Sequence, residues 1–218
     1  MERLTDEATG LLGAGTETAS WALSVMTFHL LTKPDHLTHL RDELNTILPS
    51  DGTLPAWTNL ERLPYLWAVV HEGLRLSYGV SIRMARIVPD EDLVYRGENG
   101  EYAIPRGFAV GMSPVITHHN EDIFPDSHEF RPERWLDDQM ERNLELERCL
   151  LSFSKDSRAC IGVNLALCEI YLVLTTLVIR VFPHMRLYET TERDAKYDHD
   201  LFSPVPWSGS LGVRAVIV

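Results

Sequence analysis

The sequence is poor in cysteine, in basic residues and in long apolar runs. Its 218 residues include only 3 cysteines, at no paired spacing, which excludes a disulfide framework and favours a reducing compartment. Lys and Arg number 20 against 32 Asp and Glu, and the resulting net charge of −12 argues against a nucleic-acid partner. The one long apolar run, about 163–182, carries Asn164, Glu169 and Arg180, so it predicts a buried helix rather than a membrane span. The polar first residues predict neither a signal peptide nor a membrane start.

The residues that are present indicate a folded, mainly helical chain. A hydrophobic content of 44% and a charged content of 24% are typical of folded proteins, and the length allows one substantial core. Apolar periodicity bounded by prolines and caps predicts helices over 5–31, 34–48, 64–77 and 163–181. Short β-rich runs lie between 80 and 112 and again after 185, separated by Gly and Pro. We therefore expect a mainly α fold with small antiparallel sheets, including a first strand over 80–88 and a final hairpin.

Cys160 lies directly before the predicted last helix, where free backbone N–H groups and the helix dipole favour a thiolate. Arg158 adds a cation two residues earlier. A thiolate in this setting is a metal ligand, whereas an isolated cysteine at a helix start is more often a small buried apolar residue. The residues alone leave both roles open.

Residues 14–18, Ala-Gly-Thr-Glu-Thr, lie inside the predicted first helix. Gly13 and Gly15 are unfavourable in a helix interior, which predicts a kink or a close approach to another group. Ala14 and Thr18 share one helix face because they are four residues apart. That face could border a ligand. The alternative is packing through small residues, with the Thr18 hydroxyl bonded to the carbonyl of Ala14.

Other charged and polar groups have weaker signals by themselves. Glu72 and Arg75 lie on one helix face and can pair. Arg83 and Arg86 lie three apart in the predicted strand, so they should point to opposite faces. The adjacent pair 118–119, both His, has no partner at metal-site spacing, which favours a structural hydrogen-bonding role.

Taken together, the motifs resemble those of the cytochrome P450 family, in the family's order. They are the oxygen-helix motif at 14–18, Glu-x-x-Arg at 72–75, Pro-Glu-Arg-Trp at 132–135, and the cysteine loop Phe-x-x-Gly-x-Arg-x-Cys-x-Gly at 153–162. One position departs, because Asp156 replaces the family's glycine. Glycine suits a turn with positive φ, and Asp is among the few residues that tolerate such a turn.

The resemblance implies a role for each matching residue. Cys160 would be the thiolate ligand of the iron in haem b, and Arg86 and Arg158 would bind its propionates. Thr18 would hydrogen-bond bound dioxygen and Glu17 would relay protons. The residues implied at the cofactor are Cys160, Arg158, Arg86, Phe153, Gly162, Ala14 and Gly15. A buried network of Glu72, Arg75 and Arg134 would lock the cysteine loop in place. Residues 78–82 and 201–204 would line an apolar substrate.

By the same resemblance, 1–218 is a partial P450 domain, from the oxygen-binding helix to the end, without the N-terminal portion and the membrane anchor. The implied activity is that of a haem-thiolate monooxygenase, which oxidises a small organic substrate with dioxygen and electrons from NADPH–cytochrome P450 reductase. The motifs are most similar to those of fungal microsomal-type members of secondary metabolism, which lie on the cytosolic face of the endoplasmic reticulum membrane. Two alternatives stay open: a truncated, non-catalytic or binding-only product, and a P450-type isomerase or synthase.

Overall fold

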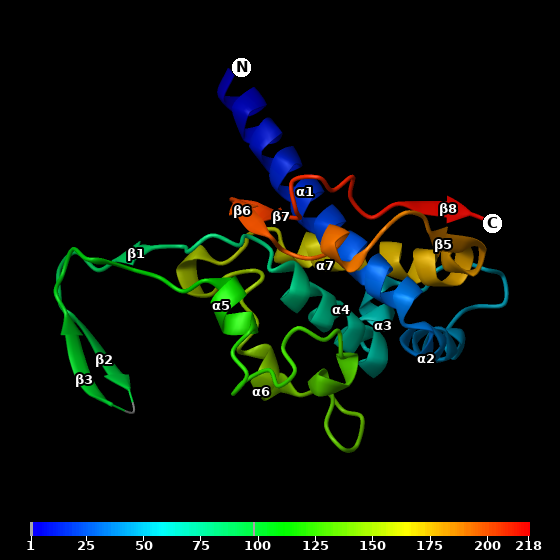
Figure 1. Cartoon of the computed structure of the whole chain (residues 1–218), viewed down its shortest axis with the longest axis horizontal. Helices are drawn as coiled ribbons and strands as arrows, with labels where there is room; N and C mark the ends of the chain where they lie inside the picture. The colour runs from blue at the N-terminus through cyan, green and yellow to red at the C-terminus, as the bar shows by residue number, and fades with distance from the viewer. Residues whose placement is uncertain (1, 98) are drawn as a thin grey trace.

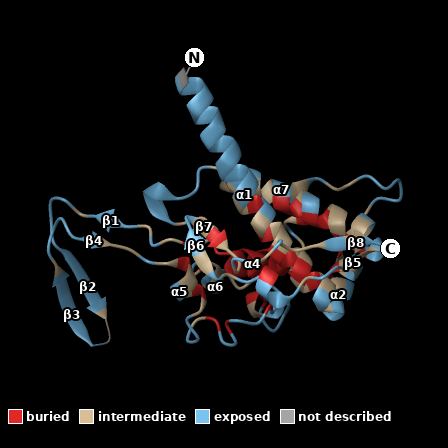
Figure 2. Ribbon diagram, turned by 45° about the horizontal axis from the view of Figure 1, so that its top comes forward, coloured by how far each residue is buried: buried red, intermediate tan, exposed pale blue. Residues whose placement is uncertain are grey.

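The core is built around one helix that is buried along nearly its whole length. The computed structural model describes residues 2–97 and 99–218. In it, α4 (Pro64–Ser77) is buried at every position from Tyr65 onward, and α1 (Glu2–Thr32), α2 (Pro34–Asn45) and α7 (Val163–Thr176) pack around it or each other (Figures 1 and 2). The Glu43 carboxylate accepts the N–H groups of Tyr65 and Leu66, each at 2.8 Å. A carboxylate at a helix N-terminus satisfies free donors and complements the dipole, so α2 fixes where α4 begins.

α1 divides into an exposed half and a packed half. Its residues 3–17 are exposed, and Figure 1 shows this half projecting from the body. From Ala19 onward one face enters the core, through Ala22, Val25, Met26 and Leu30. The predicted kink was wrong, because α1 is helical through Gly13 and Gly15. A Cβ at either glycine would meet nothing within 4 Å among the described residues, so neither allows a close approach.

The strands form small antiparallel pairs and no parallel sheet in the part of the chain that the structure describes. β1 (Arg86–Ile87) pairs with β4 (Ala109–Val110), and β2 (Leu93–Gly97) pairs with β3 (Gly100–Ile104). The predicted strand over 80–88 is therefore reduced to its last residues, since only these have a hydrogen-bonded neighbour. Instead of the expected single meander, the β2–β3 hairpin lies in the chain between the two paired strands β1 and β4.

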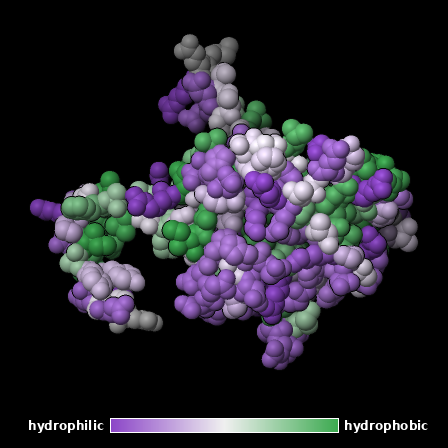
Figure 3. All heavy atoms as spheres, in the orientation of Figure 1, coloured by the Kyte–Doolittle hydropathy of each residue, from purple (hydrophilic) through white to green (hydrophobic). Residues whose placement is uncertain are grey.

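This pair of sheets forms an arm that extends from the body (Figure 1). Figure 3 shows apolar residues gathered on it, and the exposed ones are Ile87, Val94, Tyr95, Tyr102 and Phe108. Three short helices connect the larger elements: α3 (Trp57–Leu60), α5 (Pro114–His118) and α6 (Leu144–Glu147). A 3₁₀ turn, Pro132–Trp135, packs against α4.

The last helix begins and ends close to the predicted bounds. α7 continues through a π-helical turn, Leu177–Val181, and a 3₁₀ turn, Phe182–His184, where Pro183 cannot supply the next helical N–H. The helical stretch Val163–His184 is long and apolar enough to cross a membrane by length and composition, and 33% of its most apolar window is buried within the chain. Ile170, Tyr171, Leu174 and Val178 are buried there, whereas Leu165 and Val173 are exposed, so the helix predicted to be buried is buried along one face.

The tail contains the predicted hairpin together with a second strand pair. β5 (Met185–Leu187) pairs with β8 (Ala215–Ile217), and between them β6 (His199–Leu201) and β7 (Ser203–Val205) form a tight hairpin with Phe202 at its tip.

Candidate functional site

The cysteine loop lies directly before α7, as predicted. Gly162 is the residue before the first turn of α7, and Cys160 is exposed. The Cys160 N–H donates to the carbonyl of Phe153 at 2.8 Å, which closes the loop between these two motif residues. A Cβ at Gly162 would lie 3.9 Å from the Cys160 Sγ, an ordinary contact. The alternative that Cys160 is a buried apolar residue is therefore wrong, and its sulfur is accessible to a ligand.

The loop contains backbone strain at the position where the family has glycine. Asp156 has φ +59°, in the left-handed region, as its place in the motif predicts. Ser154, two residues earlier, also has φ +59°. An L-residue in this region is destabilised by about 1–2 kcal/mol, with Asp among the less affected types. The departure from glycine is therefore accommodated in the turn at an energetic cost.

Replacing Asp156 by glycine is expected to stabilise the chain by about 1 kcal/mol, because the turn then has a residue without a Cβ. The Asp156 side chain accepts no hydrogen bond in the described part of the chain, so little is lost. Urea unfolding of both variants measures the difference. Ser157→Gly is the matched control, since Ser157 has no positive φ, and it should be destabilising. A loss of stability in Asp156→Gly would contradict the strain argument.

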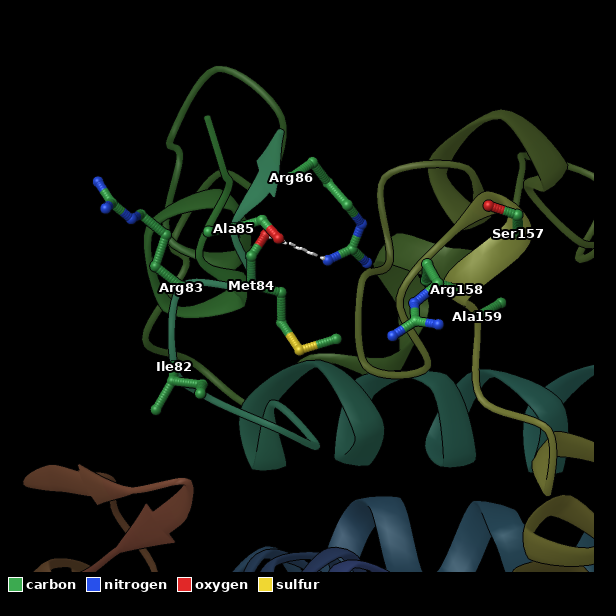
Figure 4. A pocket seen from close by; sticks show the side chains of 8 residues that line it. All are labelled: Ile82, Arg83, Met84, Ala85, Arg86, Ser157, Arg158 and Ala159. Carbon is green, nitrogen blue, oxygen red and sulfur yellow. Dashed lines mark hydrogen bonds between the residues drawn. The ribbon is translucent and has the colours of Figure 1, made fainter. Parts of the chain in front are cut away.

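Two arginines from distant segments point into one hollow beside the cysteine loop. Arg86 of β1 and Arg158 of the loop line a cavity of about 460 Å³ together with Met84, Ala85, Ser157 and Ala159 (Figure 4). Arg86 donates to the carbonyl of Ala85 at 3.1 Å, which orients its guanidinium. Arg83 also lines this hollow, but its guanidinium points away from the pair (Figure 4). It lies before β1 and outside any strand, so the predicted alternation along a strand does not apply to it. Among residues 2–97 and 99–218, neither Arg86 nor Arg158 pairs with a carboxylate, so the hollow holds two guanidinium groups without a counter-charge.

A second hollow, of about 240 Å³, is also lined by the loop. Phe153 and Cys160 line it together with Leu74 of α4 and Val163 of α7, and its lining also includes Glu147 and Lys155. The cysteine loop therefore contributes to both hollows, and Cys160 lines the second one. Phe153 is half-buried against the core, which attaches the start of the loop to the helices.

The predicted network around Glu72 is confirmed and is larger than the motif shows. The Glu72 carboxylate accepts from Arg75 Nε at 2.8 Å, Arg75 Nη2 at 2.8 Å and Arg134 Nε at 3.1 Å. It also accepts the Trp135 indole N–H at 2.8 Å and the Arg131 backbone N–H at 2.9 Å. Burial alone would raise the pKa of Glu72, but hydrogen bonds and charge from Arg75, with the charge of Arg134, hold that pKa below its usual value.

Trp135 is the member of this network that the sequence reasoning missed. Its side chain is fully buried. A buried indole N–H needs an acceptor, so a tryptophan at the end of the Pro-Glu-Arg-Trp motif was a signal for a further donor near Glu72.

His118 connects this network to the cysteine loop. Its Nδ1 bonds the carbonyl of Arg75 at 2.8 Å, and its Nε2 accepts the Leu151 N–H at 2.9 Å. Burial lowers the pKa of His118 to about 3, which keeps the ring neutral with one donor and one acceptor nitrogen. The Ser152 hydroxyl donates to the carbonyl of Leu74 at 2.7 Å. The structural role predicted for His118 is thus confirmed, and the chain entering the loop is fixed to α4 twice.

The oxygen-helix residues lie apart from these hollows. Thr18 is half-buried, and its hydroxyl donates to the carbonyl of Ala14 at 2.8 Å, the bond of the alternative interpretation. Glu17, Gly15 and Ala14 are exposed. No described residue of α1 lines either hollow beside the cysteine loop. The face that Ala14 and Thr18 share is therefore open, and their catalytic and cofactor roles stay predictions.

The residues beside the loop fit a haem. An accessible thiol can ligate iron as the thiolate, and two unpaired guanidinium groups in one hollow suit two propionate carboxylates. In the described ranges, no group of three or more His, Cys, Asp or Glu side chains is placed to hold a bare metal ion. Fold and site together give a mainly helical chain with an exposed cysteine beside two arginines.

Comparison with known proteins identifies the family. The model of the cytochrome P450 family matches residues 1–196. The cytochrome P450 monooxygenase MO6277 of Ascocoryne sarcoides is 45% identical, over 99% of this chain and 41% of that protein. The monooxygenase vrcB of Aspergillus aculeatus is 43% identical, over 100% of this chain and 40% of that protein. N-acetyltryptophan 6-hydroxylase ivoC of Emericella nidulans is 41% identical, over 98% of this chain and 41% of that protein. The chain belongs to the cytochrome P450 family, and it spans about two fifths of the length of these curated relatives.

Removing Arg86 or Arg158 is expected to weaken haem retention about tenfold for each arginine, because a charge-assisted hydrogen bond contributes on the order of 1.5 kcal/mol. The rate at which reconstituted haem transfers to an acceptor protein measures this. Arg106→Ala is the matched control, since Arg106 is exposed and lines neither hollow, and it should leave the rate unchanged. Equal losses in all three variants would show a general charge effect instead of a propionate site.

Proposed function

We propose that this chain carries the haem-thiolate site of a monooxygenase that oxidises a small organic, apolar substrate with dioxygen and electrons from NADPH–cytochrome P450 reductase. The observation that carries the proposal is the arrangement around the loop: the accessible Cys160 thiol lies between Phe153 and Gly162, and Arg86 and Arg158 converge in the adjoining hollow. Relatives named as fungal monooxygenases support the reaction class and a fungal secondary-metabolism role. A position at the endoplasmic reticulum membrane is part of the proposal and is supported by the resemblance alone.

When bound, a haem with a thiolate ligand supplies the activation of dioxygen. The chain's own residues hold and orient that cofactor. Cys160 presents its sulfur beside the start of α7. Arg86 and Arg158 would bind the propionate carboxylates and thereby orient the cofactor. The Thr18 hydroxyl and the Glu17 carboxylate can pass protons along the exposed face of α1, since Thr18 can exchange its bond to Ala14 for one to a ligand.

The carbon monoxide difference spectrum of the expressed, reduced chain tests the proposal. A thiolate-ligated haem gives the red-shifted Soret band of the family. Oxidation of a substrate that depends on NADPH and the reductase would then exclude an isomerase or synthase. Absence of haem, or a band without the shift, would contradict the active-enzyme proposal.

A binding-only product is the second candidate, and one observation favours it. The N-terminal half of α1 carries the oxygen-helix motif but is exposed, with Leu4, Leu11 and Leu12 each at least 67% exposed. Apolar residues on an open helix suit contact with another polypeptide more than catalysis in water. The same spectrum separates the two candidates, because the binding-only product takes up no haem.

A further inference from the structure

Asp194 collects hydrogen bonds from three separate positions in the C-terminal segment. Its Oδ1 accepts from the Ser210 hydroxyl at 2.6 Å and from the Trp207 indole N–H at 3.1 Å. Its Oδ2 accepts from the Thr191 backbone N–H at 2.9 Å and from the Thr191 hydroxyl at 3.0 Å. The residue is 6% exposed, so these bonds replace its hydration. None of the sequence motifs contains Asp194.

Trp207 is fixed on this carboxylate by its neighbours. The Arg193 guanidinium lies over the Trp207 ring, 4.6 Å from its centroid. A Cβ at Gly209 would lie 2.0 Å from the indole, so only glycine lets the ring pack against this backbone. The Ser210 N–H donates to the carbonyl of Trp207 at 2.9 Å and closes the turn. The position of the indole, and hence its bond to Asp194, is set by the sequence around it.

The carboxylate closes the base of a loop that reaches the functional site. The loop of residues 195–206 begins after Asp194 and ends before Trp207, and it contains the β6–β7 hairpin (Figure 1). Phe202, at the tip, is exposed with φ +79°, and its carbonyl accepts the Ser81 N–H at 3.2 Å. Tyr197 packs edge-on against Tyr78 at 5.4 Å between centroids. The loop thus rests on residues 78–81, the segment that leads to the Arg86 hollow.

We propose that Asp194 is a positioning residue that holds the β6–β7 hairpin, and Phe202 at its tip, against Ser81. Nothing else among the described contacts ties positions 191, 207 and 210 to one point. Phe202 has strained backbone and an exposed side chain, so the tip itself adds little packing, and the hairpin contacts the body through the buried Pro204 and through Tyr197. This inference rests on the proposed function, in which the Phe202 tip borders the bound substrate, and Asp194 then sets the shape of that border from outside the site.

Amide hydrogen exchange on the expressed chain decides the proposal without haem. In Asp194→Asn an NH₂ group must face the N–H and O–H donors, so at least one pair of bonds is lost. We expect exchange to rise about tenfold in residues 199–205 and at the Ser81 amide, with no change in the buried amides of α4. Ser210→Ala, which removes one donor, should show the same pattern with a smaller change. Gly209→Ala should raise exchange at the same amides without altering any charge.

The matched control is Asp200→Asn, which makes the same charge change on the hairpin itself. Asp200 is exposed, and its one described contact is with the Tyr197 hydroxyl at 3.4 Å, which an amide oxygen can also accept. It should leave exchange at Ser81 unchanged. Unchanged exchange at Ser81 in Asp194→Asn would overturn the proposal, and so would a uniform rise that includes α4, which indicates general destabilisation.

A second measurement applies when the chain takes up haem. Imidazole and 1-phenylimidazole both bind haem iron through nitrogen, but only the phenyl group extends toward the surrounding wall. Asp194→Asn should weaken 1-phenylimidazole several-fold more than imidazole, and a merely structural defect would weaken both equally. A missing carbon monoxide band would contradict the proposed function but would not affect the hydrogen-exchange result. Failure of the proposed function and failure of the Asp194 proposal are therefore distinguishable.

Discussion

Replacing Glu72 by alanine is expected to destabilise the chain by about 3–5 kcal/mol, because it leaves buried guanidinium groups without their counter-charge. The side chains of Glu72 and Arg75 are both 0% exposed, and that of Arg134 is 5% exposed. The indole of Trp135 also loses its acceptor. A typical domain has about 5–15 kcal/mol of stability in total, so the loss approaches complete unfolding. Urea unfolding followed by far-UV circular dichroism measures it.

The control for this prediction is an ion pair of the same type and spacing at the surface. Glu145 and Arg148 are also three apart, bonded at 2.9 Å, and their side chains are 79% and 77% exposed. Glu145→Ala should cost less than about 1 kcal/mol, since solvent screens the pair. Trp135→Phe should fall between the two variants, because it removes one donor and leaves the charges paired. If Glu72→Ala cost no more than Glu145→Ala, burial would not be what makes the network important.

Elements set by local chemistry could be predicted from the sequence. α4 was predicted at its observed bounds because Pro64 pre-sets the first turn and the apolar periodicity ends at Ser77. Its C-cap, Tyr78, has φ +63°, and Gly79 follows it. Gly79 has φ +70°, and a Cβ there would lie 2.1 Å from the carbonyl oxygen of Ser152. The positive φ of Asp156 followed from its place in the cysteine loop. In these cases one residue's own conformational limits decide the structure.

Features that depend on distant partners could not be predicted in the same way. The strand expected over 80–88 is short because Val110 and Ala109 offer partners only to Arg86 and Ile87. The donors from Trp135 and the Arg131 backbone reach Glu72 only once the 3₁₀ turn packs on α4. Asp194 had no motif at all, since its role arises from the return of the chain at 207–210. Sequence patterns report local preference, whereas these contacts come from tertiary packing.

The convergence of Arg86 and Arg158 depends both on local sequence patterns and on contacts between distant segments. The predicted alternation along a strand could not place these arginines, because Arg83 lies before β1 and both Arg83 and Arg86 line the hollow. The family resemblance selected Arg86, and the shared hollow supports that selection. Thr18 is the opposite case, because the resemblance assigns it a catalytic role while its hydroxyl is bonded within its own helix.

Replacing Cys160 by serine is expected to abolish the red-shifted carbon monoxide band completely while leaving the fold intact. Serine keeps the backbone N–H that donates to Phe153, and Cys160 is exposed, so no packing is lost. A serine hydroxyl does not ionise near neutral pH and cannot replace the thiolate as a strong donor to iron. The unfolding free energy should therefore change by less than about 0.5 kcal/mol, as for most surface substitutions.

The other two cysteines provide the control, because neither lies in the loop. Cys149 and Cys168 are half-buried, and Cys149→Ser and Cys168→Ser should each keep the shifted band. A readout independent of the spectrum is maleimide labelling, which should modify the exposed Cys160 fastest in the haem-free chain. Haem should then protect Cys160 selectively, since a ligated thiolate is not free to react. Persistence of the shifted band in Cys160→Ser, or its loss in Cys168→Ser, would mean that the iron is held by a different residue.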